Sequence, residues 1–344
     1  MPERPRKPFT GRVAVVREAV TAQAGPDAQD TLIQAEAVCR ALSRATCAEI
    51  ELGDSLPALE TDLRRFAPDV VFNLVESHDG QTTLACVAPA LYRRLGLPFT
   101  GNEEAALLLA GDKAAAARIM NASGILTPPG LCLGDVSRGG FPGPGTYIVK
   151  SRFEDASVGL DENCVVAVRT ASELVQTMRA LAPAMGGDCV AEKYVDGREF
   201  NLALLGGPGK RVCVLPVAEM LFDPAMAGPR ILHYAAKWHE GSPAWAASSR
   251  AFGLADNDLI QGMIRAGLRC WDVFGLAGYA RVDFRVAASG EIHVIDINPN
   301  PCLSPDAGFA AAGERCGMDY AELIEILVAE ALWRRSGRPR RELQ

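Results

Sequence analysis

Short apolar stretches alternate with helical stretches over the first third of the chain. Residues 12–16 and 68–74 have the continuous apolar character of buried strands, and residues 30–45 and 84–95 have the spacing of helices. Strands that alternate with helices predict a parallel sheet, and the ligands of such sheets bind beyond the carboxyl ends of the strands. We therefore predict an α/β, Rossmann-like first unit over residues 1–110.

A second unit, α+β in character, is predicted over residues 111–195. It opens with an alanine-rich helix at Asp112 and Lys113, and Thr170 or Ser172 is the expected N-cap of a later helix. The expected elements are strands at 147–150, 165–168 and 189–195, a polar loop at 151–159 and a helix at 172–182.

Two apolar stretches in a third unit, predicted over residues 196–335, read as the strands of a hairpin. Because strand side chains alternate between faces, Asp296 and Asn298 share one face, and Arg281 and Asp283 also share one. Three oxygen ligands beside an arginine suit a hard divalent cation such as Mg²⁺ and an anionic substrate. The alternative is a hairpin whose edge carboxylates only face water.

The composition is that of an ordinary folded protein. The 344 residues are 49% hydrophobic and 22% charged, and the net charge of −7 argues against general nucleic-acid binding. Ten cysteines occur without a Cys-x-x-Cys pair, so zinc and redox signatures are missing. Neither a signal core nor a membrane-length apolar run occurs. We predict a cytoplasmic protein without nucleic-acid or membrane partners.

The chain is expected to end in a helix at 320–333 and a solvated, frayed arginine-rich stretch at 334–341. Residues 336–344 are set apart as a basic tail.

Two polar segments are candidates for nucleotide binding. Lys150 closes an apolar strand ahead of small residues and Gly159, so a point charge and backbone N–H groups could meet a phosphate. Without the Walker spacing, an ordinary surface turn explains that loop better when it is taken alone. At residues 192–200 a strand turns at Gly197, which exposes backbone groups to a flat base, and Glu199 could accept from ribose hydroxyls. A turn with solvent-facing charges is the equal alternative.

Taken in order, these segments resemble ATP-grasp ligases, and most of all D-alanine–D-alanine ligases. The likeness spans roughly residues 65–330. It is carried by residues 72–74, 97–101, 112–113, 149–150, 192–199, 236–238, 281–284 and 296–298. It implies an ATP-grasp fold behind a Rossmann-like pre-ATP-grasp domain, with a lid subdomain at 111–195 and a metal and catalytic subdomain at 196–335.

The resemblance also implies roles for individual residues. Lys113 and Lys150 would contact ATP phosphates. The adenine and ribose would be bound by Glu192, Lys193, Tyr194, Val195 and Glu199. Two Mg²⁺ ions, with Mn²⁺ as an alternative, would be bound by Asp283, Asp296 and Asn298. The residues with implied catalytic roles are Arg281 at the acyl phosphate and tetrahedral intermediate, Lys237 at the γ-phosphate from a mobile loop, and Ser157 in substrate orientation.

The nucleotide half departs from the family pattern at a few positions. Asp296 stands where the family usually has glutamate, a shorter arm that should still bind magnesium. Ala156 replaces a serine that helps to orient substrate, and Trp238 replaces a tyrosine.

The substrate half departs further. Glu18 is the nearest acid to the family's first-domain glutamate, and His78 is either a substrate contact or a loop histidine. Cys302 falls at a glycine that helps to hold the intermediate; a small buried residue explains it better than a catalytic thiol. Ala307 and Gly308 replace the serine–leucine pair that binds the second D-alanine's carboxylate.

We therefore expect an ATP-dependent ligase that activates an amino acid or small carboxylate as an acyl phosphate and condenses it with an amine, releasing ADP and phosphate. D-Alanyl-D-alanine synthesis for peptidoglycan precursors is the first alternative. A catalytically inactive nucleotide-binding regulatory protein is the second. The substrates are not identified, and the oligomeric state stays open, although the family likeness favours a homodimer through the first domain.

Overall fold

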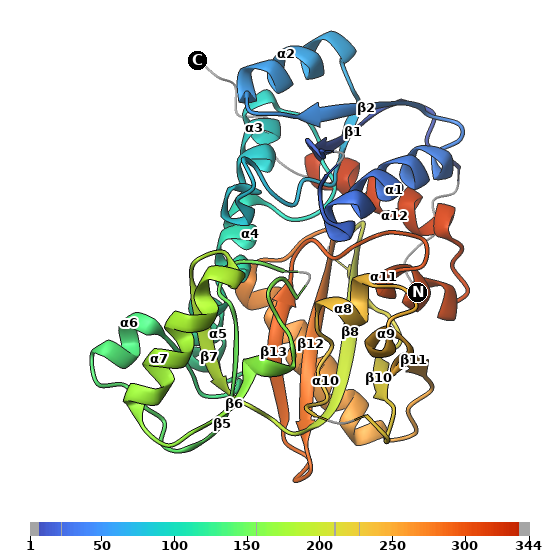
Figure 1. Ribbon diagram of the computed structural model, residues 1–344. Helices are drawn as coiled ribbons and strands as arrows, with labels where there is room; N and C mark the ends of the chain where they lie inside the picture. Colours follow the sequence, from blue (N-terminus) through green and yellow to red (C-terminus); the bar gives the residue numbers. More distant parts are fainter. Residues whose placement is uncertain (1–6, 22, 156, 210, 227, 337–344) are drawn as a thin grey trace.

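The computed structural model describes residues 7–21, 23–155, 157–209, 211–226 and 228–336. These residues form sheets of three, four and six strands, each with helices packed on it. In Figure 1 the three-stranded sheet lies at the top, the four-stranded sheet at the lower left and the six-stranded sheet at the lower right. The sheets follow along the chain in the order of the predicted units, whose boundaries stay a prediction.

The first sheet is parallel, as the alternation of strands and helices predicts. Its order is β2 (Thr46–Leu52), β1 (Arg12–Glu18) and β3 (Val70–Asn73). Its helices are α1 (Pro26–Ala41), α2 (Leu56–Phe66) and α3 (Val87–Leu95), whereas the next helix, α4 (Glu104–Gly111), packs against the third sheet. The sequence analysis missed β2 and α2. β2 is a half-exposed edge strand without a continuous apolar run, and α2 buries only Leu59 and Leu63.

The second sheet is antiparallel, with the strand order β4–β7–β5–β6. Its strands are β4 (Gly130–Cys132), β5 (Gly145–Ser151), β6 (Val165–Val168) and β7 (Cys189–Lys193), and its helices are α5 (Lys113–Ala122), α6 (Leu133–Ser137) and α7 (Ala171–Leu181). Thr170 is the N-cap of α7, as expected. Tyr147 and Val149 point into a core with α7, so by alternation Ile148 and Lys150 face the opposite side.

The third sheet is also antiparallel. Its strands are β8 (Gly197–Gly207), β9 (Arg211–Val214), β10 (Ala218–Phe222), β11 (Ser248–Phe252), β12 (Tyr279–Ala287) and β13 (Ile292–Asn298), and its helices are α8 (Tyr234–Trp238), α9 (Pro243–Ala246) and α10 (Asn257–Phe274). Val282 and Phe284 of β12 share a core with Met263 and Trp271 of α10. The alternate side chains of β12 therefore lie on the face away from α10.

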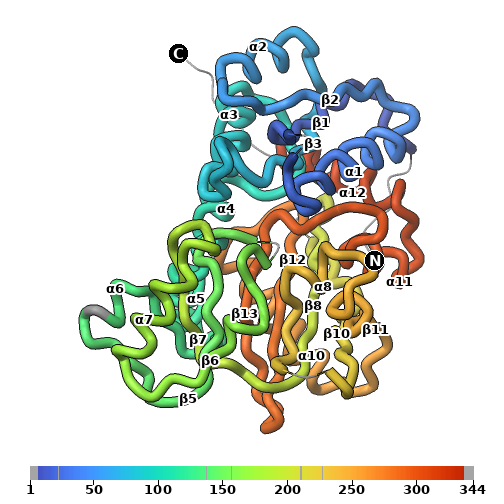
Figure 2. The backbone as a smooth tube through the Cα atoms, viewed as in Figure 1, coloured from blue at the N-terminus to red at the C-terminus, as the bar shows by residue number. Residues whose placement is uncertain are grey.

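The C-terminal helices α11 (Gly308–Arg315) and α12 (Tyr320–Ser336) return to the first sheet. Ile324 and Leu327 of α12 lie in one core with Val13 of β1 and Val38 of α1. Figure 2 shows this red helix beside the blue start of the chain. The last part of the chain thus helps to build the first unit. No helix in the described ranges is long and apolar enough to cross a membrane.

The expected fraying from residue 334 onward is wrong at Arg334. Its Nη2 donates to the carbonyl oxygens of Phe99 at 2.8 Å and Gly101 at 2.9 Å, and its Nε lies 2.8 Å from an oxygen of Glu330. Glu330 lies one turn earlier on α12, a local i,i+4 pair, whereas Phe99 and Gly101 lie on the loop after α3, which no local pattern predicts. Residues 337–344 lie outside the described residues.

Candidate active site

β12 and β13 form the predicted hairpin, and its register brings the predicted polar residues together. Asp283 lies opposite Asp296, and Arg281 lies opposite Asn298. Arg281 donates to both oxygens of Asp283, from Nε at 2.7 Å and from Nη2 at 2.8 Å. Burial acts to lower the pKa of Arg281, but the carboxylates of Asp283, Asp296 and Asp155 together raise it above its ordinary value. Arg281 is therefore a fixed cation at this face.

β8 adds two contacts that the sequence reasoning did not find. Asn201 lies opposite Asp283, and its Nδ2 donates to Asp283 Oδ1 at 2.7 Å. Arg285 lies opposite Glu199, and its Nη2 donates to Glu199 Oε2 at 2.7 Å. Strand alternation could have identified both, because Asn201 is two residues from Glu199 and Arg285 is two residues from Asp283.

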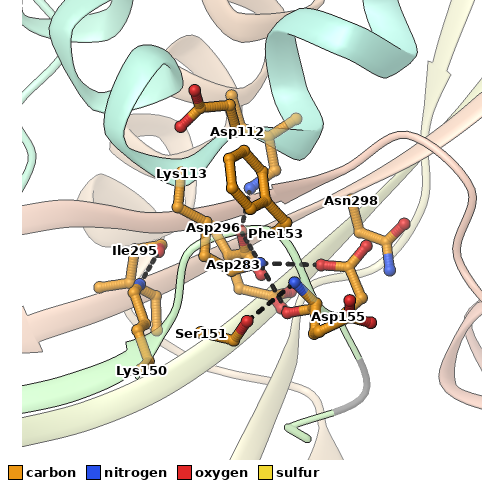
Figure 3. Close-up of polar contacts among 12 residues, drawn as sticks. Asp112, Lys113, Lys150, Ser151, Phe153, Asp155, Asp283, Ile295, Asp296 and Asn298 are labelled. Atoms are coloured by element: carbon orange, nitrogen blue, oxygen red, sulfur yellow. Dashed lines mark hydrogen bonds and ion pairs between the residues drawn. The ribbon is translucent and has the colours of Figure 1, made fainter. Parts of the chain in front are cut away.

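The start of α5 and the loop after β5 meet at Lys113. Asp112 caps α5 by accepting the N–H of Ala114 at 3.0 Å, which begins the helix at Lys113. Lys113 Nζ lies 3.0 Å from Asp155 Oδ1 and 4.0 Å from Asp296 Oδ1 (Figure 3). Burial acts to lower the pKa of Lys113, but these carboxylates raise it above the ordinary lysine value. Sequence reasoning missed Asp155, which lay in an unassigned polar loop.

Lys150 links the second sheet to the third. Its Nζ donates to the carbonyl oxygen of Ile295 at 2.7 Å, as Figure 3 shows, and lies 3.0 Å from Glu192 Oε2. Asp296 follows Ile295 in β13. Burial acts to raise the pKa of Asp296, but the surrounding cations lower it below its ordinary value. Those cations are, in decreasing order of effect, Lys113, Lys150, Arg281 and Lys237. Asp296 is therefore ionised at neutral pH.

The end of β7 presents backbone groups and an aromatic ring. Neither the N–H nor the carbonyl of Val195 has a hydrogen-bond partner within the described part of the chain. The ring centroid of Tyr194 lies 5.6 Å from Cζ of Arg285. The ammonium of Lys193 donates to the carbonyl oxygens of residues 143 and 144, both at 2.7 Å. The charge of Lys193 is thus already bound by backbone, whereas Val195 has free backbone groups.

Every site residue that the sequence predicted lines one cavity of about 130 Å³. A second cavity, of about 1250 Å³, adjoins it. The residues that line both are Asp155, Glu199, Leu232, Lys237, Arg281, Asp283 and Asn298. A ligand in the smaller cavity would meet a ligand in the larger cavity at these residues.

Comparison with known sequences explains why these segments come together. Residues 136–329, more than half of the chain, match the family model described as D-ala D-ala ligase C-terminus. The chain belongs to the D-alanine–D-alanine ligase family. A D-alanine–D-alanine ligase of Synechococcus sp. is 31% identical over 259 residues, covering 72% of this chain and 72% of that protein.

A second similar sequence and a similar crystal structure agree with this family. The uncharacterized protein y4sG of Sinorhizobium fredii is 32% identical over 282 residues, covering 77% of this chain and 78% of that protein. The crystal structure of the D-alanine–D-alanine ligase from Bacillus anthracis complexed with ATP has the same fold, with a TM-score of 0.70 at 18% identity over 95% of this chain and 99% of that one. The protein is therefore an ATP-grasp ligase of the C–N bond-forming class, in a family that uses ATP with a divalent metal.

In this ligase, Lys237 and Ser157 lie on segments that touch each other. Lys237 is on the short helix α8, and burial together with the charge of Arg281 lowers its pKa. Ser157 adopts a left-handed backbone conformation, with φ of +63°, and its Oγ donates to the carbonyl of Leu232 at 2.8 Å. This bond ties the loop after β5 to the segment that carries Lys237, whose mobility stays a prediction. Ala156 lies outside the described residues.

The structure bears on two residues of the substrate half whose roles the sequence left open, His78 and Cys302. His78 lies in a turn, where its N–H donates to the carbonyl of Gln81, and its side chain lines neither cavity. Cys302 lines the larger cavity, and its thiol donates to Asp30 Oδ2 at 2.9 Å. Burial and the charge of Asp30 raise the pKa of Cys302 well above the ordinary thiol value. A protonated thiol is a poor nucleophile, which argues against a catalytic thiol, but Cys302 is half-buried at the cavity wall rather than fully buried.

Glu18 is also held away from both cavities. Its carboxylate accepts from the hydroxyl of Thr31 at 3.2 Å and from the backbone N–H of Glu76 at 2.9 Å. Glu76 itself lines the larger cavity, as do Asp27 and Asp30 of α1, whereas Glu18 does not.

The oxygen atoms at the hairpin fit a hard divalent cation. No cluster of three or more His, Cys, Asp or Glu side chains suited to a metal occurs in the described residues, but Asn298 adds an amide to the two carboxylates. Asp296 uses Oδ1 to accept the N–H of Ile297 at 3.1 Å, and a carboxylate oxygen retains lone pairs beyond one such bond. Asp283, which already accepts from Arg281 and Asn201, has fewer free. The side-chain oxygen of Asn298 also accepts, from the N–H of Asn300 at 2.8 Å, so Asp296 has the most acceptor capacity left of the three.

Proposed function

We propose that this ATP-grasp ligase transfers the γ-phosphate of ATP to an amino acid or other small carboxylate and then joins the acyl group to an amine, with release of ADP and phosphate. The observation that carries the proposal is the pair of adjoining cavities. The smaller is lined by all of the nucleotide and metal residues, and the larger has room for two small substrates. The cations Lys237 and Arg281 line both, which is where phosphoryl transfer to a carboxylate has to occur.

In this proposal the end of β7 binds the adenine and Glu199 binds the ribose. The free N–H and carbonyl of Val195 match the acceptor and donor on the edge of an adenine ring, and Glu192, Lys193 and Tyr194 line the same wall. Lys113 and Lys150 would exchange their present carboxylate partners for phosphate oxygens. Because both ammonium groups are positioned already, they require little reorganisation at that step.

Asp283, Asp296 and Asn298 would hold two Mg²⁺ ions, or Mn²⁺ ions, on the same face. When bound, the ions neutralise phosphate charge and orient the transferred group. The chain itself supplies Arg281, held rigidly by Asp283, to stabilise negative charge on the acyl phosphate and on the tetrahedral intermediate. The bond from Ser157 to Leu232 keeps two covering segments together, which would exclude water from an acyl phosphate that hydrolyses easily.

D-Alanine–D-alanine ligation is the second candidate function, and family membership favours it. Against it, Ala307 and Gly308 line the larger cavity where the expected serine and leucine are missing, and Cys302 stands in place of a glycine. A nucleotide-binding protein without activity would not require Arg281, both phosphate lysines and the carboxylates to be retained together. A homodimer through the first sheet stays a prediction.

The test is product formation with Mg–ATP and a pooled panel of D- and L-amino acids, small amines and dipeptides, analysed by mass spectrometry. We expect a condensed product together with ADP. D-Ala-D-Ala as the dominant product would favour the second candidate, and ATP binding without turnover across the panel would contradict ligation.

A variant pair tests the assigned metal face. Asp283→Asn should abolish amine-dependent ADP release, because it removes a carboxylate from the hairpin and weakens the hold on Arg281. Asp272→Asn, which changes an exposed carboxylate on α10, is the matched control and should leave the rate unchanged. Full amine dependence in Asp283→Asn would refute the role of Asp283.

A further inference from the structure

Arg250 is a charged residue of the larger cavity that the proposed reaction does not use. It lies on β11, opposite Met220 of β10, and both side chains line that cavity. Within the described ranges, the guanidinium of Arg250 has no hydrogen bond or ion pair. Arg281, on another part of the same wall, is by contrast bound through both arms to Asp283. Arg250 is thus a cation of the cavity that still lacks a counter-ion.

The guanidinium lies against the start of α11. A Cβ built on Gly308 would lie 3.3 Å from Nη2 of Arg250 and 3.5 Å from its Cζ, which places the guanidinium within contact distance of this residue. Ala307, the N-cap of α11, makes no side-chain capping bond, so the first N–H groups of the helix have no side-chain partner. Arg250 and the first turn of α11 therefore border the same space with hydrogen-bond donors.

Arg250 offers an anion a cation of the cavity wall at some distance from the reacting groups. It is an exposed residue, and partial desolvation together with the nearby charge of Arg281 lowers its pKa, while Asp306 acts in the opposite direction. A bound carboxylate would relieve the repulsion between the two guanidinium groups. Another part of the wall carries Asp30, whose carboxylate would repel such an anion.

We propose that Arg250 is a specificity-determining residue of this ligase, which binds the carboxylate of the amine-bearing substrate. The assignment rests on the ligase reaction proposed above. It gives carboxylate recognition to a side chain of β11, at the place where Ala307 and Gly308 have no side chain that could provide it. An arginine suits this role because its planar fork binds both carboxylate oxygens.

The test compares an acceptor acid with its carboxamide, which keeps the amine and the side chain but lacks the anion. Alanine and alaninamide are the first pair, followed by the corresponding pair for the best acceptor in the panel. In the wild type, kcat/KM should be higher for the acid. Arg250→Met should raise KM for the acid about 10- to 100-fold, the effect of losing one charge-assisted contact. It should leave KM for ATP and kcat/KM for the carboxamide unchanged, and Arg250→Lys should restore part of the loss.

Arg269→Met is the matched control, because Arg269 is exposed on α10 and lines neither cavity. Thermal unfolding of each variant shows whether it is folded. An equal loss for acid and carboxamide in Arg250→Met, or no loss for either, would overturn the role of Arg250.

The proposal can also fail or succeed separately from the ligase reaction. If the wild type condenses no member of the panel, the proposed reaction fails, and calorimetry with D- and L-alanine in the presence of Mg–ADP decides about Arg250. Weaker binding in Arg250→Met than in Arg269→Met would support the carboxylate site. Equal binding, or no binding by the wild type, would exclude it.

Discussion

Asn102 ties the first unit of the ligase to both strands of the catalytic hairpin. Its Oδ1 accepts the N–H of Ala277 at 2.7 Å, and its Nδ2 donates to the carbonyl oxygens of Tyr279 at 2.8 Å and Pro299 at 2.6 Å. Tyr279 begins β12, and Pro299 follows the last residue of β13. One carboxamide, only 2% exposed, thus fixes the entry and the exit of the hairpin.

Asn102→Ala should be strongly destabilising. The change removes all three hydrogen bonds and leaves three backbone groups without their partner in a buried place. An unsatisfied buried polar group costs about 1–3 kcal/mol, and a water molecule that enters the vacated space would recover part of that cost. We therefore expect the free energy of unfolding to fall by about 3–5 kcal/mol.

The measurement is urea denaturation followed by both far-UV circular dichroism and tryptophan fluorescence, since a chain with several units can depart from two-state unfolding. Asn163→Ala is the control, because the Asn163 side chain is exposed and donates only to Asp161, at 3.3 Å; it should change the free energy by less than about 0.5 kcal/mol. A loss below about 1 kcal/mol in Asn102→Ala would refute the reasoning, because it would mean that the three groups find other partners without strain.

Three further predictions follow from single contacts. Gly278→Ala should destabilise the ligase and lower its melting temperature, because Gly278 has φ of +64° and an added Cβ would lie 2.7 Å from the backbone nitrogen of Gly101. A melting temperature equal to that of the wild type would contradict this. Lys150→Met should raise KM for ATP by about 10-fold or more through loss of a phosphate contact, with the acceptor KM unchanged, and an unaltered KM for ATP would remove Lys150 from the phosphate site. Cys302 should react slowly with iodoacetamide between pH 7 and pH 9, because its raised pKa keeps the thiol protonated over that range. Alkylation is mapped by mass spectrometry, and rapid alkylation of Cys302 would show that the thiolate forms easily.

Strand periodicity made much of the catalytic face readable from the chain. Alternation alone places Arg281 with Asp283, and Asp296 with Asn298, because side chains two residues apart in a strand leave on the same side. The same rule applies to Asn201 and Arg285, which the sequence reasoning passed over although Glu199 and Asp283 pointed to them. The positions of Asn201 and Arg285 could therefore have been predicted from strand alternation alone.

The contacts that complete the site depend on the tertiary structure. Asp155 becomes the partner of Lys113 because the loop after β5 packs against the start of α5, and nothing in the polar loop marks that residue in advance. The hydrogen bond from Cys302 to Asp30 joins residues that are 272 positions apart. Asp30 helps to raise the pKa of this thiol, which favours its unreactive, protonated form. Arg250 likewise becomes a candidate substrate residue only when β11 and α11 border the same cavity.

The sequence by itself determined the order of the sheets along the chain, the parallel first sheet and the hairpin, because these depend on patterns within one strand or one turn. The roles of the nucleotide and metal residues came from the family resemblance and stay predictions. Only the tertiary structure decided the register of Asp283 against Asp296, the return of α12 to the first sheet, the anchoring of the hairpin by Asn102 and the joining of two cavities at Lys237 and Arg281. The physical reason is that these features arise from packing and hydrogen bonds between distant segments, whose energies depend on three-dimensional fit and leave no periodic trace in either segment alone.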